Sequence, residues 1–226
     1  MSFYHQWIAL LTTGWLIASG LLTGCSTPPG ATSQRGMART DGERGVPHDP
    51  QTAFNWHRKA ADQGDATAQT KIGIMYADGQ GVPQDFVEAA KWFRQAADQG
   101  HPSAQFLLGL LYAGGEGVAK DRVTAATWFR QAADQGHATA QFLLGLMHFR
   151  GEGVAQDNIE AYKWLSLATA GGNEDSQRTR ELLREKLTEY EMEEAQRLSE
   201  EFRRKSTPAN DQNVTTRGAR FQRRAR

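Results

Sequence analysis

A 36-residue period runs through the middle of the chain and restricts its fold more than any other feature. Four tryptophans keep this interval, at Trp56, Trp92, Trp128 and Trp164. Aspartates and glycines keep it too, at Asp49, Asp85, Asp121 and Asp157 and at Gly64, Gly100, Gly136 and Gly172. A fixed period of about 20 to 50 residues is the signature of repeat proteins, in which one small unit is stacked several times. The period therefore predicts an array of such units.

Each unit predicts two helices joined by a glycine-containing turn. Between Asp85 and Gly100 the apolar side chains fall at helical spacing, and they are Ala89, Trp92, Phe93, Ala96 and Ala97. Asp85 is placed to cap the start of this helix, and Gly100 to end it in a left-handed conformation. The second helix covers 102–113 and runs into Gly115-Glu-Gly117-Val118, a turn that recurs at 79–82 and 151–154.

Helices of this length must pack against neighbours, because helices of about twelve residues are marginal alone. One hairpin cannot bury both its faces, so the hairpins are expected to stack. No segment shows the alternation of a β-strand, and the Gly-x-Gly turns lack the preceding strand that a phosphate loop needs. The sequence therefore predicts an all-α fold, a short α-solenoid of stacked antiparallel helical hairpins.

The repeated pattern Ala-Gln-Phe-Leu-Leu-Gly-Leu, followed by Gly-Glu-Gly-Val and Ala-x-x-Trp-Phe-x-x-Ala-Ala, resembles the Sel1-like repeat, a relative of the tetratricopeptide repeat. Complete copies run over 66–101, 102–137 and 138–173. A half repeat over 45–65 is expected before them, and charged capping helices over 174–205 after them, because charge replaces apolar residues there. The resemblance implies a right-handed solenoid that binds other proteins.

The N-terminus predicts an export signal with a lipid anchor. An apolar run of sixteen residues from Trp7 to Leu22 is shorter than the roughly 20 that span a membrane, and suits a signal peptide over 1–24. Leu22-Thr23-Gly24-Cys25 resembles the bacterial lipobox, which implies lipidation of Cys25; the alternative is an uncleaved helix with an incidental cysteine. Lys and Arg are absent from residues 1–6, which departs from the usual signal. Ser26 resembles the pattern of outer-membrane lipoproteins that face the periplasm.

Two further segments carry few large apolar residues. Residues 25–44 predict a flexible tether. Residues 206–226 predict a disordered basic tail, which either contacts anionic lipids or glycans or keeps the chain soluble. Over the whole chain 26 basic residues balance 26 acidic ones, so no nucleic-acid binding is expected.

No catalytic constellation stands out, so we expect no enzyme activity, no cofactor and no metal site. His101 and His137 are one period apart, and stacked repeats would separate them by about 10 Å, too far to share a metal ion. Some Sel1-like proteins described as acting on β-lactams have a disulfide in each repeat. This chain has one cysteine in all, Cys25, so that likeness fails.

The remaining candidate for a binding site is an apolar groove. By similarity to tetratricopeptide repeats, the first helix of each unit lines the concave side, where its outward residues are Ile74, Phe106, Leu110, Phe142, Leu146 and Phe149. If these side chains are exposed, they form a strip suited to an extended peptide or a partner helix. Otherwise they pack between neighbouring units.

The sequence thus predicts a monomeric, lipid-anchored periplasmic adaptor that binds an unidentified protein or peptide in envelope assembly, export or host interaction. Two alternatives remain at this point. One is a glycan-binding component of polysaccharide export. The other is an envelope enzyme acting on the cell wall or on β-lactams.

Overall fold

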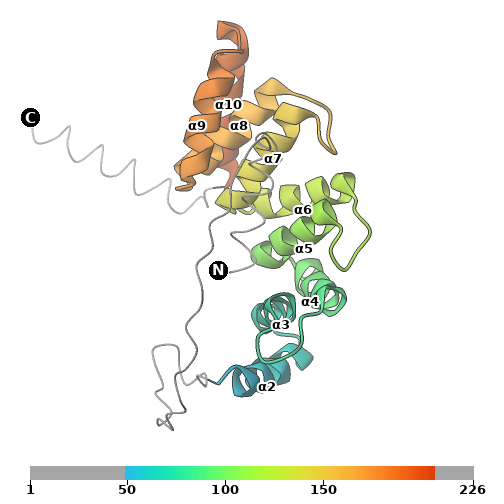
Figure 1. Ribbon diagram of the computed structural model, residues 1–226. Helices are drawn as coiled ribbons and strands as arrows, with labels where there is room; N and C mark the ends of the chain where they lie inside the picture. The colour runs from blue at the N-terminus through green and yellow to red at the C-terminus, as the bar shows by residue number, and fades with distance from the viewer. Residues whose placement is uncertain (1–48, 207–226) are drawn as a thin grey trace, which may run out of the picture. The chain divides into compact units, whose positions relative to one another are not determined.

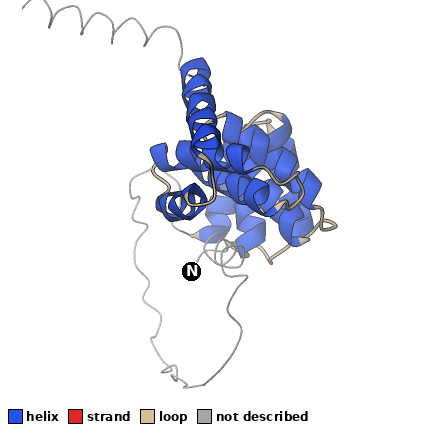
Figure 2. Cartoon of the chain, turned by 90° about the horizontal axis from the view of Figure 1, so that it is seen from above, coloured by secondary structure: helices blue, strands red, loops and turns tan. Residues whose placement is uncertain are grey.

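The computed structural model describes residues 49–206, which form helices connected by short turns (Figure 1). The helices are α2 (Pro50–Asp62), α3 (Ala66–Asp78), α4 (Phe86–Asp98), α5 (Pro102–Gly114), α6 (Arg122–Asp134), α7 (Ala138–Arg150), α8 (Asn158–Ala170), α9 (Glu174–Arg184) and α10 (Glu189–Ser206). Figure 2 shows no strand in this part of the chain. The predicted all-α fold is confirmed.

The described residues divide into two compact units, 49–92 and 93–206, with the division inside α4. In the first unit α2 packs on α3. Their shared core consists of Phe54, Ala61, Ala68, Ile72, Met75 and Trp92. The rings of Phe54 and Tyr76 meet edge to face, with centroids 5.4 Å apart.

In the second unit each helix packs mainly on its neighbours in the sequence. The pairs in contact are α5 with α6, α6 with α7, and α7 with α8. Helix α8 also packs on both α9 and α10. Apart from the contact between α8 and α10, these contacts join adjacent elements, as expected for a solenoid.

The first helices of the repeats, α5 and α7, are covered on almost every side. All residues from 104 to 111 and from 140 to 148 are buried. Their sequences are apolar around the whole helix, which is typical of helices inside a protein. Gly109 and Gly145 permit close packing here, since a Cβ on Gly109 would lie 2.7 Å from the Phe129 ring and one on Gly145 would lie 2.9 Å from Leu165.

The aspartates that recur with the period cap the helices that follow them, as predicted. Asp121 accepts from the backbone N–H of Val123 and Thr124, and Asp157 accepts from that of Glu160 at 3.0 Å. The turn glycines are left-handed as expected, with φ of +84° at Gly115 and +73° at Gly153.

Three of the four periodic tryptophans belong to the core. Trp92, Trp128 and Trp164 are 8%, 9% and 1% exposed. Trp56, by contrast, is 48% exposed and does not belong to the core. Its indole meets His57 edge to face.

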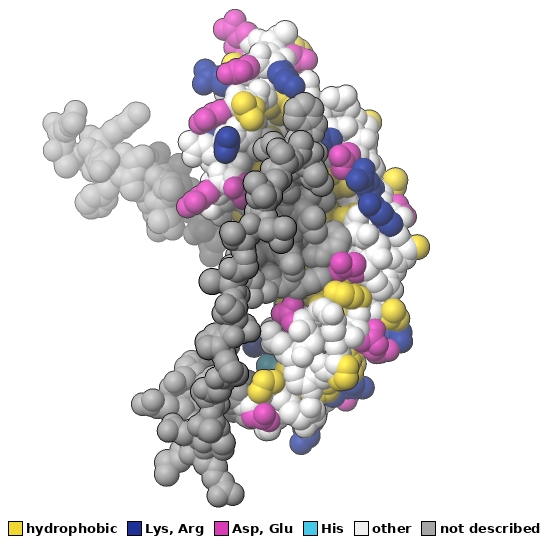
Figure 3. All heavy atoms as spheres, viewed as in Figure 1, with side chains coloured by type: hydrophobic (Ala, Val, Ile, Leu, Met, Phe, Trp, Pro, Cys, Tyr) yellow, Lys and Arg dark blue, Asp and Glu magenta, His cyan; other side chains and the backbone are white. Residues whose placement is uncertain are grey.

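Helices α9 and α10 follow the last full repeat. Thr188 and Glu191 form a capping box at the start of α10: the Thr188 N–H donates to Glu191 Oε2 at 2.9 Å, and the Glu191 N–H to Thr188 Oγ1 at 3.3 Å. Acidic side chains are prominent over these two helices (Figure 3). Several of them pair with exposed bases, as Glu194 and Glu201 do with Arg197. The ring of Phe202 in α10 covers Trp164 at 5.4 Å.

The predicted signal peptide, Cys25, the tether and the basic tail from residue 207 onward lie outside the described residues. Between residues 49 and 206, none of the helices combines the length and the apolar character needed to cross a membrane.

Candidate functional site

The predicted apolar groove is not an exposed strip. Four of its six side chains are almost completely buried, with exposures of 1% for Phe106, 1% for Leu110, 2% for Phe142 and 7% for Leu146. Ile74 and Phe149 are partly exposed. The expectation of exposure therefore has to be corrected for these four residues.

The cause of this burial lies in the second unit itself. The ring of Phe106 stacks on His137 at 4.6 Å and contacts Phe129 at 5.8 Å. The side chains that the sequence assigned to a partner are thus used to hold successive hairpins together, which was the alternative interpretation.

Arginines two residues after the periodic tryptophans connect one hairpin to the next. The guanidinium carbon of Arg94 lies 5.1 Å from the centroid of the Trp128 ring, and that of Arg130 lies 5.9 Å from Trp164. In the first unit Arg58 lies 4.8 Å from Trp92 in the same way. These cation–π contacts form a series that is repeated with the period.

The same arginines also make hydrogen bonds, which assigns them a structural role. Arg94 donates to the hydroxyl of Tyr112. Arg130 Nη2 lies 2.9 Å from Nε2 of His148. Burial lowers the pKa of His148, and the nearby charge of Arg130 lowers it further. A neutral imidazole can accept a hydrogen bond from the guanidinium at Nε2.

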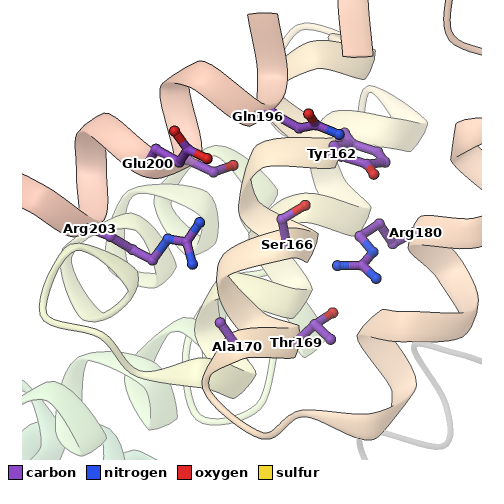
Figure 4. A pocket seen from close by; sticks show the side chains of 9 residues that line it. Tyr162, Ser166, Thr169, Ala170, Arg180, Gln196, Glu200 and Arg203 are labelled. Atoms are coloured by element: carbon purple, nitrogen blue, oxygen red, sulfur yellow. The ribbon is translucent and has the colours of Figure 1, made fainter. Parts of the chain in front are cut away.

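The series of arginines ends in α8, where Ser166 stands two residues after Trp164. At this place an open cavity of about 370 Å³ lies between α8, α9 and α10 (Figure 4). Its lining residues are Tyr162, Ser166, Thr169, Ala170, Arg180, Gln196, Ser199, Glu200 and Arg203.

Two of the hydroxyl groups in this cavity are occupied by the protein. Thr169 Oγ1 bonds the carbonyl of Leu165 at 2.8 Å and the hydroxyl of Ser176 at 2.7 Å. Ser199 Oγ donates to the carbonyl of Ala195 at 2.8 Å. The bond between Thr169 and Ser176 joins α8 to α9, and Ser199 Oγ also donates to the carbonyl of Lys163 in α8 at 3.4 Å.

Other polar groups of the cavity have no partner within residues 49–206. They belong to the side chains of Tyr162, Ser166, Arg180, Gln196 and Glu200. Tyr162 is only 7% exposed, yet its hydroxyl forms no hydrogen bond with this part of the chain. Figure 4 shows that hydroxyl, Ser166 and the guanidinium of Arg180 facing the same space. This cavity is the candidate site.

A metal site is not apparent in the described part of the chain, where no group of three His, Cys, Asp or Glu side chains is placed to hold an ion. His137, one of the two periodic histidines, caps α7 by accepting from the N–H of Ala140 at 3.2 Å. Burial lowers its pKa.

Comparison with known proteins agrees with the repeat pattern. The family model of the Sel1 repeat matches residues 31–65, 66–101, 102–137 and 138–173. The chain belongs to the Sel1 repeat family. The last three matches have the bounds predicted from the period, and the first includes the segment 45–65 that the sequence suggested was a half unit.

Two solved structures of Sel1 repeat proteins resemble this chain. A protective antigen of uropathogenic Escherichia coli with an SLR fold is 36% identical, with a TM-score of 0.65, over 70% of this chain and 34% of that one. A Sel1 repeat protein of Oxalobacter formigenes is 34% identical, with a TM-score of 0.57, over 58% of this chain and 54% of that one. These likenesses confirm the solenoid of stacked hairpins. The chain thus spans between a third and about half of the length of these proteins, and no curated protein matches it significantly.

Several residues that line the cavity differ from the residues at the corresponding positions of the earlier repeats. Counted by the 36-residue period, Ser166 replaces arginine and Thr169 replaces alanine. Tyr162 also replaces alanine, and Arg180 replaces the buried leucine of earlier copies, Leu108 or Leu144. Residues that recur with the period do not indicate this site. It is indicated by the positions at which the last copy differs from the earlier ones.

Proposed function

We propose that this Sel1 repeat protein is a non-enzymatic scaffold that binds another protein through the cavity between α8, α9 and α10. Sel1 repeat proteins bind other proteins, which supports the class of function. The observation that carries the proposal is the set of unpartnered polar side chains in that cavity, with Tyr162 buried among them. A partner that supplies complementary groups satisfies them.

The chemistry of the cavity favours binding over catalysis. A nucleophilic hydroxyl needs an adjacent base within hydrogen-bond reach. Histidine, cysteine and aspartate are missing from the lining residues, and Ser166 has no hydrogen bond to Glu200. The cavity therefore offers binding groups without the pair of groups that acyl transfer requires.

We place this scaffold at the outer membrane, facing the periplasm, with a lipid on Cys25 as its anchor. The support for this location is the lipobox-like segment 22–25 after an apolar run. In such an arrangement residues 26–48 connect the membrane to the first described helix.

The anchor is tested by mass spectrometry of the protein purified from its native membrane. We expect the mature protein to begin at Cys25 and to carry the mass of attached acyl chains. A Cys25→Ala variant should remain unprocessed and unacylated. A mature N-terminus at any other residue would contradict the anchor.

Partner binding is tested by photo-crosslinking in intact cells. A photoreactive amino acid at Gln196, on α10 at the cavity, should give one discrete adduct with another protein. The same amino acid at Val123, which is 63% exposed on α6, serves as the control and should not give that adduct. Identical adducts from both positions, or none from Gln196, would count against the cavity as the binding site.

A further inference from the structure

Hydrogen-bond donors dominate one side of the cavity between α8, α9 and α10. The guanidinium of Arg180 has donors only, and the hydroxyls of Tyr162 and Ser166 can rotate to donate in the same direction. None of the three has an acceptor within the described residues. A ligand that brings charged acceptor oxygens can take up these donors in strong hydrogen bonds.

We propose that this cavity binds the terminal carboxylate of a partner's polypeptide chain. Arg180 lies on α9 and forms the fork that accommodates two carboxylate oxygens at once. The hydroxyls of Tyr162 and Ser166, both on α8, donate to the remaining lone pairs. This inference rests on the proposed function, because it names the part of the partner that the scaffold holds.

The opposite side of the cavity suits the rest of a peptide end. Gln196 and Glu200 come from α10 and make no hydrogen bond within residues 49–206. Their side-chain oxygens can accept from the backbone N–H of the terminal residue. The volume of about 370 Å³ lies near the lower limit of roughly 300–1,000 Å³ for ligand pockets, which fits the end of a chain.

The charge of the cavity favours an anion. Arg180 and Arg203 contribute two positive charges and Glu200 one negative charge, so the lining residues carry a net positive charge. A carboxylate carries one negative charge, whereas a phosphate group at neutral pH carries about −1.5 to −2. The titration with inorganic phosphate separates these two ligands.

A solubilising role for the polar residues does not account for this arrangement. Polar substitutions in a terminal repeat keep its outer face in water. Tyr162, however, is 7% exposed and stands where earlier repeats have Ala90 and Ala126. A tyrosine there keeps most of its side chain buried and presents its hydroxyl to the cavity beside Arg180 (Figure 4).

The test is an NMR titration of the full chain with two acetylated tetra-alanine peptides, one ending in a carboxylate and the other in an amide. We expect the carboxylate peptide to shift the side-chain N–H signal of Arg180 and the backbone signals of residues 162–170. The amide peptide should bind at least tenfold more weakly. Equal binding of the two peptides, or no binding of the carboxylate peptide, would overturn the proposal.

Matched variants assign the effect to Arg180. Arg180→Gln should weaken binding of the carboxylate peptide at least tenfold, while Arg178→Gln, exposed on the same helix, should leave it unchanged. Arg180→Leu restores the residue of the earlier repeats and keeps the test valid if the glutamine variant does not fold. An equal loss in the Arg178 variant would overturn the assignment.

Two further ligands separate the proposal from neighbouring classes. Inorganic phosphate that binds as tightly as the carboxylate peptide would reveal a general anion site and overturn the proposal. Binding of glucuronate without binding of the carboxylate peptide would overturn the proposal and would identify an acidic sugar as the ligand.

The crosslinking experiment distinguishes this inference from the proposed function. If Gln196 still captures a protein partner although no carboxylate peptide binds, only the carboxylate inference fails. If the peptide binds and Gln196 captures no protein, the scaffold function at this cavity fails and the carboxylate site stands.

Discussion

Trp128 connects two hairpins through a single side chain. Its indole is 9% exposed and lies under the guanidinium of Arg94, which also bonds Tyr112. Large apolar area and a cation–π contact act together at this position. The residue thus belongs to the packing between helices and is not available to a partner.

We expect Trp128→Ala to lower the free energy of unfolding by roughly 3–5 kcal/mol, because truncation of a large core side chain leaves a cavity. Urea denaturation followed by circular dichroism measures the loss. Val123→Ala on the same helix is the control and should change stability by less than about 0.5 kcal/mol, because Val123 is 63% exposed. Similar losses in the two variants would show that Trp128 is not part of the core.

At the scale of the helices and turns, two glycines with positive φ are required for different reasons. Gly136 has φ +85° and open space where a Cβ would be. Gly153 has φ +73°, and a Cβ there would lie 2.3 Å from the carbonyl oxygen of Arg122. The first position requires only a left-handed backbone. The second also requires that the turn after α7 approach the start of α6.

Alanine at these two positions should therefore have unequal effects. Gly136→Ala is expected to cost about 1 kcal/mol for the left-handed conformation alone. Gly153→Ala adds a backbone clash, for which overpacking typically costs a further 1–3 kcal/mol or so. Thermal unfolding of both variants beside the unchanged protein gives the comparison, and a smaller loss for Gly153→Ala would contradict the close approach.

The helices could be predicted from the sequence because each repeat contains its own start, stripe and stop. Asp121, Trp128 and Gly136 mark one helix completely, and the period then places the others. The capping box of Thr188 and Glu191 is a local signal of the same kind. Local signals of this kind depend on residues within one or two turns, so they need no knowledge of the neighbours.

The binding site could not be predicted in the same way, because exposure depends on which helices cover a side chain. The period places Phe106 on one face of α5 but does not reveal that His137 and Phe129 occupy that face. The cavity is also a property of the boundary of the array. It depends on Ser166 and Arg180, which break the pattern from which the rest was inferred.

At the scale of the whole molecule, buried histidines make stability depend on pH. Burial lowers the pKa of His57, and the charge of Lys71 adds to this effect. Burial likewise lowers the pKa of His137 and, together with Arg130, that of His148. His57 belongs to the first compact unit and the other two to the second, so both units are affected.

The direction in which stability changes with pH follows from the number of protons that the folded and unfolded states bind. An unfolded histidine has a pKa of about 6.5, so below that pH the unfolded chain binds more protons than the folded one. The stabilisation is therefore complete above about pH 6.5 and is lost as the pH falls toward the lower pKa values of the folded state. Burial raises the pKa of Asp134, which acts on stability in the opposite direction to the histidines.

We expect the urea concentration at the unfolding midpoint of the full chain to decrease when the pH is lowered from 7.5 to 5.5. His148→Gln should show a smaller fall, because glutamine keeps an acceptor for Arg130 but has no proton to gain in this range. Equilibrium denaturation at several pH values, at constant ionic strength, measures the slope for both proteins. A midpoint that stays constant over this range would show that the histidines are protonated as readily in the folded protein as in the unfolded chain. A slope identical in the His148 variant would assign the effect to His57 and His137 alone.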